Sequence, residues 1–205
     1  MPADVTPQQR RTTMAGIAVS TFVTLALWWV LLRFLPPPKI VQPLFIAFAC
    51  IPIAALLTLV AGVEAVAHER LVTAAIDPLA GVETRRLSVN FRYLSNTVEQ
   101  FIIFAVGLIG LALYASAQVL IIVAIVWVLT RWAFWIGYHK SPLLRGLGAP
   151  GMLQSMLVIL YVAYRFGSDA YGKSAGIALL VIFAVIEAIL FWAVKRPSPA
   201  TPASS

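Results

Sequence analysis

Two groups of polar side chains lie within stretches of sequence that are otherwise apolar. The first group is Arg92, Asn96 and Glu99, spaced i, i+4 and i+7, so on a helix the three side chains share one face. Polar groups inside a membrane span are costly and usually face the interior of a helix bundle or a wet cavity. The spacing therefore predicts a polar stripe that points into a bundle.

The second group contains Arg131 and Tyr138, which share one helical face with the aromatic residue Phe134, and Arg145, which follows in a loop or at the start of the next helix. Guanidinium groups bind carboxylates through paired hydrogen bonds. A carboxylate such as Glu99 can hold an ammonium group. Together the two groups would form a polar pocket suited to a small anionic or zwitterionic ligand.

A purely structural interpretation of the same residues is also open. Arg92, Asn96 and Glu99 could form an internal ion pair and an amide contact that hold helices together. Arg131 and Arg145 could extend their side chains to lipid headgroups.

The elements that must position these residues are membrane-spanning helices. The chain of 205 residues is 61% hydrophobic and 11% charged, whereas a soluble domain averages about 25% charged residues. Six apolar segments are present, and a spanning helix needs about 20 residues. They cover residues 14–35, 44–67, 89–114, 116–138, 150–166 and 174–194, of which the fifth is short for a span. The composition predicts an all-α integral membrane protein with six spans and a kink at Pro52.

The basic residues indicate the orientation of these spans. With a cytoplasmic N-terminus, ten basic residues lie on the cytoplasmic side, namely Arg10, Arg11, Arg70, Arg85, Arg86, Arg92, Lys140, Arg145, Lys195 and Arg196. Four lie on the other side, namely Arg33, Lys39, Arg165 and Lys173. The positive-inside rule then predicts that both termini are cytoplasmic. The first segment could instead be a signal peptide, but its apolar run is longer than the usual 7–15 residues, which favours a retained helix.

The order and spacing of the polar residues resemble those of a known family, the MAPEG proteins of eicosanoid and glutathione metabolism. The resemblance rests on Arg92-x-x-x-Asn96-x-x-Glu99, followed by Arg131, then Gly137-Tyr138, then Arg145. The loop at residues 75–81 is similar to that of bacterial members, which implies a location in a bacterial inner membrane.

The resemblance implies a four-helix bundle that forms a homotrimer and holds glutathione between neighbouring subunits at the cytoplasmic side. Helices two to five would form this bundle, with one additional helix at each end. The expected organisation is a cytoplasmic N-terminus at residues 1–13, an extra helix and loop at 14–43, the four-helix domain at 44–166, a C-terminal helix at 167–195 and a disordered tail at 196–205.

The resemblance also implies a chemistry. Arg145 would stabilise the glutathione thiolate, because a nearby cation lowers the pKa of a thiol. The tripeptide would be bound by Arg92, Asn96, Glu99, Arg131 and Tyr138. Glutathione is then the co-substrate, with no metal expected, and an apolar second substrate would enter from the lipid. The expected reaction is conjugation of an apolar electrophile or reduction of a lipid hydroperoxide.

Two residues depart from the family pattern. Eicosanoid-type members often carry Tyr where this chain has Gln100 and Phe134. These changes favour a second hypothesis, in which the chain is a non-catalytic membrane protein of the same fold that binds a lipid or small anion or serves in assembly.

Other classes of function have less support in the sequence. A small transporter would be expected to show internal repeats, and we find none. A metal or haem site between His68 and His139 lacks an accompanying cluster of Cys or carboxylate ligands. The net charge of +7 is explained by basic residues that flank helices, so the partner expected is the lipid bilayer and not nucleic acid.

Overall fold

The computed structural model describes residues 6–77, 79 and 81–194. The described residues form helices and no strands, and six helical stretches are long and apolar enough to cross a membrane, as the sequence predicted. In chain order the elements are α1 (Pro7–Phe34), α2 (Pro43–Ala55), a π-helical segment η1 (Leu56–Val60), α3 (Ala61–Leu71), the 3-10 turn η2 (Ala74–Ile76), α4 (Arg85–Leu111), α5 (Ala117–Lys140), the 3-10 segment η3 (Pro142–Gly148), α6 (Ala149–Tyr171) and α7 (Lys173–Val194). The predicted disordered tail lies outside the described residues.

Helix α1 begins at Pro7, well before the apolar run that starts at Met14. Thr6 caps it: the Thr6 side chain accepts a hydrogen bond from the Gln9 backbone N–H, and the Gln9 side chain accepts one from the Thr6 N–H. This capping box, followed by a proline in the first turn, satisfies backbone donors that no helical partner reaches. A hydropathy profile alone does not predict a helix start that polar residues form.

The second span, α2–η1–α3, is irregular in its middle. The sequence predicts a kink at Pro52, and the π-helical segment begins four residues later, at Leu56. Two carbonyl oxygens of this segment accept side-chain hydrogen bonds, Thr58 O from the Tyr93 hydroxyl at 3.2 Å and Leu57 O from Trp132 Nε1 at 3.0 Å. Hydrocarbon offers no partners for free carbonyls, so these two bonds stabilise the π segment and tie the span to α4 and α5.

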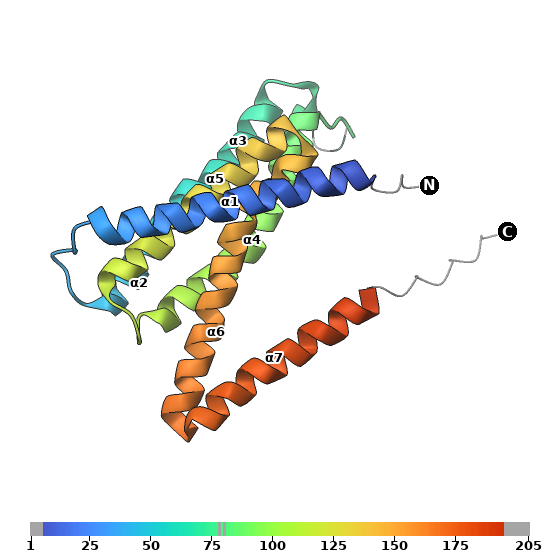
Figure 1. Ribbon diagram of the computed structural model, residues 1–205. Coiled ribbons are helices and arrows are strands. Elements are labelled where there is room, and N and C mark those ends of the chain that lie inside the picture. The colour runs from blue at the N-terminus through green and yellow to red at the C-terminus, as the bar shows by residue number, and fades with distance from the viewer. Residues whose placement is uncertain (1–5, 78, 80, 195–205) are drawn as a thin grey trace. The chain divides into compact units, whose positions relative to one another are not determined.

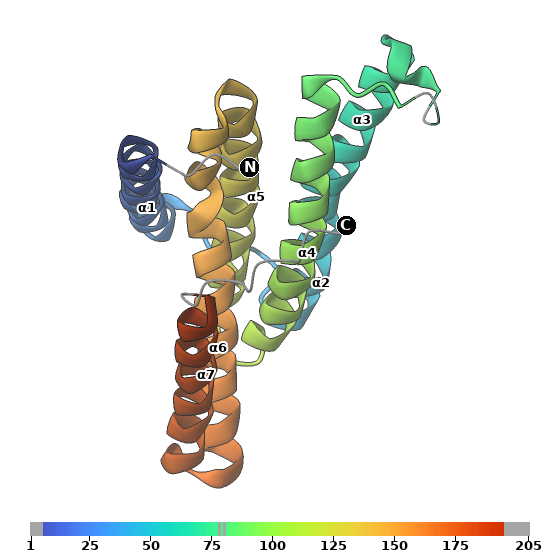
Figure 2. The same ribbon diagram turned by 90° about the vertical axis from the view of Figure 1, so that its right-hand side faces the viewer.

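Helices α4 and α5 form a tight hairpin that makes the core. Thr84 caps α4, and only residues 112–116 separate the two helices. Aromatic rings stack between them, with centroids 4.4 Å apart for Phe104 and Trp127 and 4.6 Å apart for Tyr93 and Trp135. Helix α5 contacts α1, α2, α4 and η3, and α3 runs beside α4 (Figures 1 and 2).

The fifth span is longer than the apolar run at residues 150–166 indicates. Segment η3 continues into α6, so the helical stretch runs over Pro142–Tyr171, 30 residues. The C-terminal end of this stretch is polar, with Arg165 Nη2 lying 3.7 Å from the Asp169 carboxylate one turn later. A helix of this length spans a bilayer.

The chain divides into two compact units, Met1–Ile159 and Leu160–Ser205. The described part of the second unit is the end of α6 and the helix α7. Its helices approach closely at glycine, since a Cβ on Gly176 would lie 2.5 Å from the Tyr164 carbonyl oxygen. Gly172, with a φ of +92°, makes the turn between them. The candidate functional residues all lie in the first unit.

Candidate functional site

A cavity of about 450 Å³ lies within the first unit, in the size range of small-molecule sites. Helices α1, α4, α5 and the η3 region supply its lining, namely Thr13, Ile17, Arg92, Asn96, Gln100, Arg131, Phe134, Tyr138, Arg145, Gly146, Gly148 and Ala149. Among these described residues are three arginines and no acidic residue. We refer to it as the cationic cavity, and its charge favours an anionic occupant.

Helix α4 contributes three polar residues to the cationic cavity. Arg92, Asn96 and Gln100 are spaced by four, which places them along one face over about 12 Å of the helix axis. The Gln100 amide donates a hydrogen bond to Asn96 Oδ1 at 3.1 Å. Two of the three side chains, Asn96 and Gln100, are therefore connected by a hydrogen bond.

Arg131 on α5 is the most unusual residue of the cavity. Only 1% of its surface is exposed, and no Asp or Glu of the described residues lies within ion-pair distance of it. Its Nη1 donates to Asn96 Oδ1 at 3.1 Å and its Nη2 to the Gly148 carbonyl oxygen at 2.6 Å, while its Nε has no hydrogen-bond partner in the described part of the chain. A buried cation without a carboxylate is costly, so an anion in the cavity would stabilise it.

The remaining two cations lie on α4 and on the 3-10 segment η3. Arg92 Nη1 donates to the Tyr138 hydroxyl oxygen at 3.3 Å, which joins α4 to α5. Arg145 is exposed and is presented by the 3-10 segment η3, whose first turn is capped by Ser141. The three guanidiniums thus come from three different elements, and their side chains surround one volume.

Close packing at glycine sets the position of η3 against α5. A Cβ on Gly148 would collide with the Phe134 Cβ and would lie 2.9 Å from Arg131 Nη2. A Cβ on Gly137 would lie 2.6 Å from the Leu144 carbonyl oxygen. The absence of side chains at these two positions allows the Gly148 carbonyl to reach the Arg131 guanidinium.

The structure brings together five of the six residues that the sequence indicated: Arg92, Asn96, Arg131, Tyr138 and Arg145 all line the cationic cavity. Glu99 does not line it, and its side chain is exposed. Gln100 and Phe134, the two positions that depart from the family pattern, do line it.

Five lining residues carried no signal in the sequence as ligand-binding positions. Thr13 and Ile17 come from α1, which has no polar stripe, and Gly146, Gly148 and Ala149 contribute small surfaces. Gln100 could have been identified from its spacing, because it lies one turn beyond Asn96 on the face that carries Arg92.

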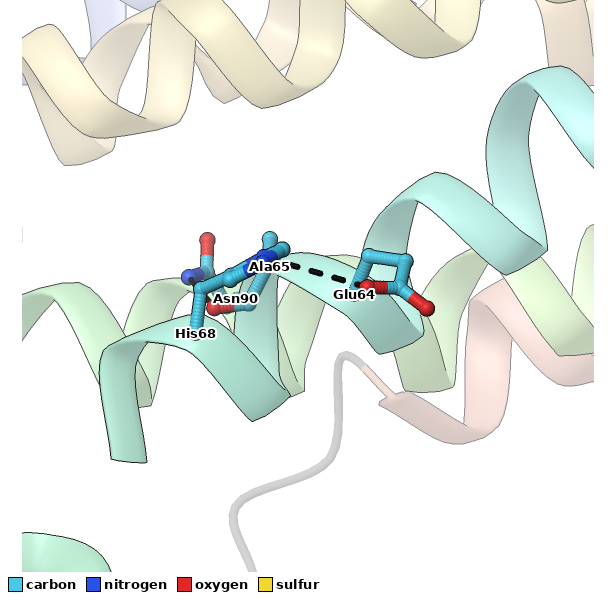
Figure 3. Close-up of polar contacts among 4 residues, drawn as sticks. All are labelled: Glu64, Ala65, His68 and Asn90. Atoms are coloured by element: carbon cyan, nitrogen blue, oxygen red, sulfur yellow. Dashed lines mark hydrogen bonds and ion pairs between the residues drawn. The ribbon is translucent and has the colours of Figure 1, made fainter. Parts of the chain in front are cut away.

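The two histidines have structural contacts on different helices. His68 Nδ1 lies 3.8 Å from the Glu64 carboxylate on the exposed side of α3, and Asn90 Nδ2 donates to the Ala65 carbonyl oxygen at 3.3 Å beside it (Figure 3). Asn90 Oδ1 accepts from Trp135 Nε1 and contacts His139 Nε2, each at 2.9 Å. Asn90 therefore connects α3, α4 and α5. Across the described residues, no three His, Cys, Asp or Glu side chains lie together as a metal site would require.

Comparison with known proteins adds one finding. A model of the MAPEG family matches residues 43–168, more than half of the chain and nearly all of the cavity lining. No curated protein and no solved structure matches the chain.

Proposed function

Because this chain belongs to the MAPEG family, we propose that it is a membrane-bound glutathione-dependent transferase or peroxidase that acts on apolar electrophiles or lipid hydroperoxides. The observation that supports this proposal is the cationic cavity. It lies in an integral membrane protein and gathers three guanidiniums, two amides and a phenol without an acidic residue in its described lining.

The charges of glutathione suit this cavity. The tripeptide has two carboxylates, and we assign Arg92 and Arg131, which both line the cavity, to bind them. Its ammonium group needs an acceptor. Glu99 is exposed on a single chain. In the homotrimer that the family resemblance implies, we assign Glu99 as the acceptor for the ammonium group of the glutathione that a neighbouring subunit binds.

Arg145 would act on the sulfur. A guanidinium beside the thiol favours the thiolate, and the proton leaves to water. In conjugation the thiolate sulfur forms a bond to the electrophilic carbon, and the leaving group departs with its electron pair. In peroxide reduction the sulfur takes the distal oxygen of the O–O bond, the alcohol leaves, and a second glutathione converts the sulfenic acid to the disulfide with release of water.

A turnover assay tests this proposal directly. The purified protein is incubated with glutathione and either 1-chloro-2,4-dinitrobenzene or cumene hydroperoxide, and product is followed by absorbance. We expect activity above the uncatalysed rate that falls at least tenfold in Arg145→Ala. Arg33→Ala, a change at an exposed cation at the end of α1, is the matched control and should keep full activity. Equal rates in Arg145→Ala and the unmodified protein would refute the catalytic role.

One observation favours a second candidate function. Gln100 and Phe134 line the cavity where eicosanoid-type members often carry tyrosine, so the site has fewer phenol hydroxyls. A protein that binds a lipid headgroup or small anion without catalysis, or serves in assembly, would retain the guanidiniums but would not need these phenol hydroxyls. Saturable anion binding without any turnover in the assay above would support it.

The proposed setting is a bacterial inner membrane with both termini in the cytoplasm. The excess of basic residues on one side of the six spans supports this orientation. Arg92 and Arg145 then face the cytoplasm, where glutathione would enter, while the apolar substrate arrives from the bilayer.

A further inference from the structure

Helix α1 forms one side of the cationic cavity, although it lies outside the part of the chain that matches the family. Thr13 and Ile17 are both among the lining residues. The contact with η3 is close: a Cβ on Gly146 would lie 2.9 Å from Ile17 Cγ1 and 3.5 Å from the Thr13 carbonyl oxygen. The three lining arginines therefore share their cavity with a helix that the family bundle does not include.

Polar contacts fix α1 in this position. No residue of α1 is fully buried, so its packing alone does not determine its register. Trp28 Nε1 donates to Gln154 Oε1 at 2.8 Å, and the same Gln154 amide donates to the Val123 carbonyl oxygen at 2.9 Å. Gln118 Nε2 donates to the Leu35 carbonyl oxygen at 2.7 Å. In a bilayer, where apolar burial between helices contributes little, such hydrogen bonds help to specify which helices pack together.

The side chains of α1 near the cavity differ in what they contact. Thr12 Oγ1 donates to the Gln8 carbonyl oxygen, which is an internal helix contact. The next residue, Thr13, lines the cavity, and Ile17 lies one turn further on the same side. Thr13 therefore offers a hydroxyl group, and Ile17 an apolar side chain, to a ligand in the cavity.

We propose that α1 is a built-in wall of the cationic cavity within the same chain, and that Thr13 and Ile17 contact the bound anionic ligand and limit its size on that side. The identity of this ligand as glutathione rests on the proposed function, whereas the wall itself does not.

Charged thiol reagents test the wall without any assumption about the ligand. In a Cys50→Ser background, Thr13→Cys is modified with an anionic and with a cationic methanethiosulfonate, and Thr12→Cys is the neighbouring control. Three guanidiniums around the cavity should attract the anion. We expect the anionic-to-cationic rate ratio to be at least tenfold higher at position 13 than at position 12. Equal ratios at the two positions would overturn the proposal.

Cross-linking tests whether the wall belongs to the same chain. Ile17→Cys combined with Gly146→Cys should form an intrachain disulfide on mild oxidation, because the two side chains would be in contact. Phe22→Cys with Gly146→Cys is the control, since Phe22 is exposed on α1 and does not line the cavity. Covalent dimers in place of the intrachain product would show that α1 packs on a neighbour and would overturn the proposal.

Protection by glutathione sulfonate, a thiol-free analogue, separates this proposal from the proposed function. If the unmodified protein binds the analogue and binding slows modification of Thr13→Cys at least fivefold, both proposals are supported. Binding that leaves this rate unchanged would overturn ligand contact by α1. If the unmodified protein does not bind the analogue, the proposed function fails, while the charge selectivity and the intrachain cross-link still decide whether α1 is the wall.

Discussion

Arg131 shows how far residue spacing predicts the site. The sequence placed it on one helical face with Tyr138 and near the Arg92 stripe, and all three line one cavity. The spacing of Glu99 along α4 predicted a carboxylate in the same pocket as Arg131. In the structure the Glu99 side chain is exposed, and Arg131 is buried without a carboxylate beside it. Spacing determines the face of a helix to within about one residue, and the neighbouring Gln100 occupies the cavity side.

The hydrogen bonds of Arg131 lead to a first prediction. Arg131→Lys keeps the charge, but an ammonium cannot reproduce the planar arrangement that reaches both Asn96 and the Gly148 carbonyl. Loss of one charge-assisted hydrogen bond at this buried position should lower the free energy of unfolding by roughly 1.5–3 kcal/mol. Thermal unfolding in detergent, followed by tryptophan fluorescence, measures this change. Arg33→Lys is the control, and equal midpoints for the two variants would contradict the prediction.

Phe134 leads to a second prediction. Its ring centroid lies 5.3 Å from the Arg131 guanidinium carbon, and the Arg131 Nε has no partner among the described residues. Phe134→Tyr adds an oxygen that can accept from a guanidinium or bind the ligand, so we expect glutathione to bind about three- to tenfold more tightly. Equilibrium titration measures the affinity, with Phe34→Tyr at the exposed end of α1 as control. Weaker binding by the Phe134 variant would count against a ligand in this cavity.

At the scale of elements, hydropathy predicted the six helices but not how each one begins, bends or continues. The start of α1 depends on Thr6 and Gln9, which are polar. The π segment of the second span has its carbonyls bonded by Tyr93 and Trp132 from other helices, so local sequence cannot reveal it. The wall formed by α1 depends on contacts between residues that are more than a hundred positions apart.

The approach of η3 to α5 leads to a third prediction. A Cβ on Gly148 would collide with Phe134 and crowd Arg131, so Gly148→Ala should destabilise the protein by about 1–3 kcal/mol. Gly16→Ala is the contrast, because no atom lies within 4 Å of its added Cβ in the middle of α1. There the better helix propensity of alanine should stabilise by about 0.5–1 kcal/mol. Thermal unfolding of both variants gives the comparison, and a neutral Gly148→Ala would show that η3 is not held closely against α5.

The attachment of α1 leads to a fourth prediction. Trp28→Phe removes the donor to Gln154, a residue that is 8% exposed, and leaves its oxygen without that partner. We expect a loss of about 1–3 kcal/mol and a slower intrachain cross-link between positions 17 and 146. Trp29→Phe is the adjacent control, since Trp29 is exposed. Identical cross-linking rates in the two variants would show that this hydrogen bond does not position α1.

At the scale of the whole molecule, the chain is an integral membrane protein of the MAPEG family with a cationic cavity inside its first unit. Composition predicted the membrane environment, since a chain with 11% charged residues cannot cover a water-facing surface. We propose a homotrimer in which the exposed Glu99 of each subunit faces a ligand of its neighbour.

Calorimetric titration of the detergent-purified protein with glutathione, together with ultraviolet absorbance of the thiolate, tests the central claim most directly. The account predicts saturable binding with thiolate formation in the unmodified protein, retained in Arg33→Ala. In Arg145→Ala the thiolate signal should be lost, because that variant lacks the cation beside the sulfur. Absence of binding at millimolar glutathione would contradict the proposed chemistry and direct attention to lipid headgroups as the anion that the cavity holds.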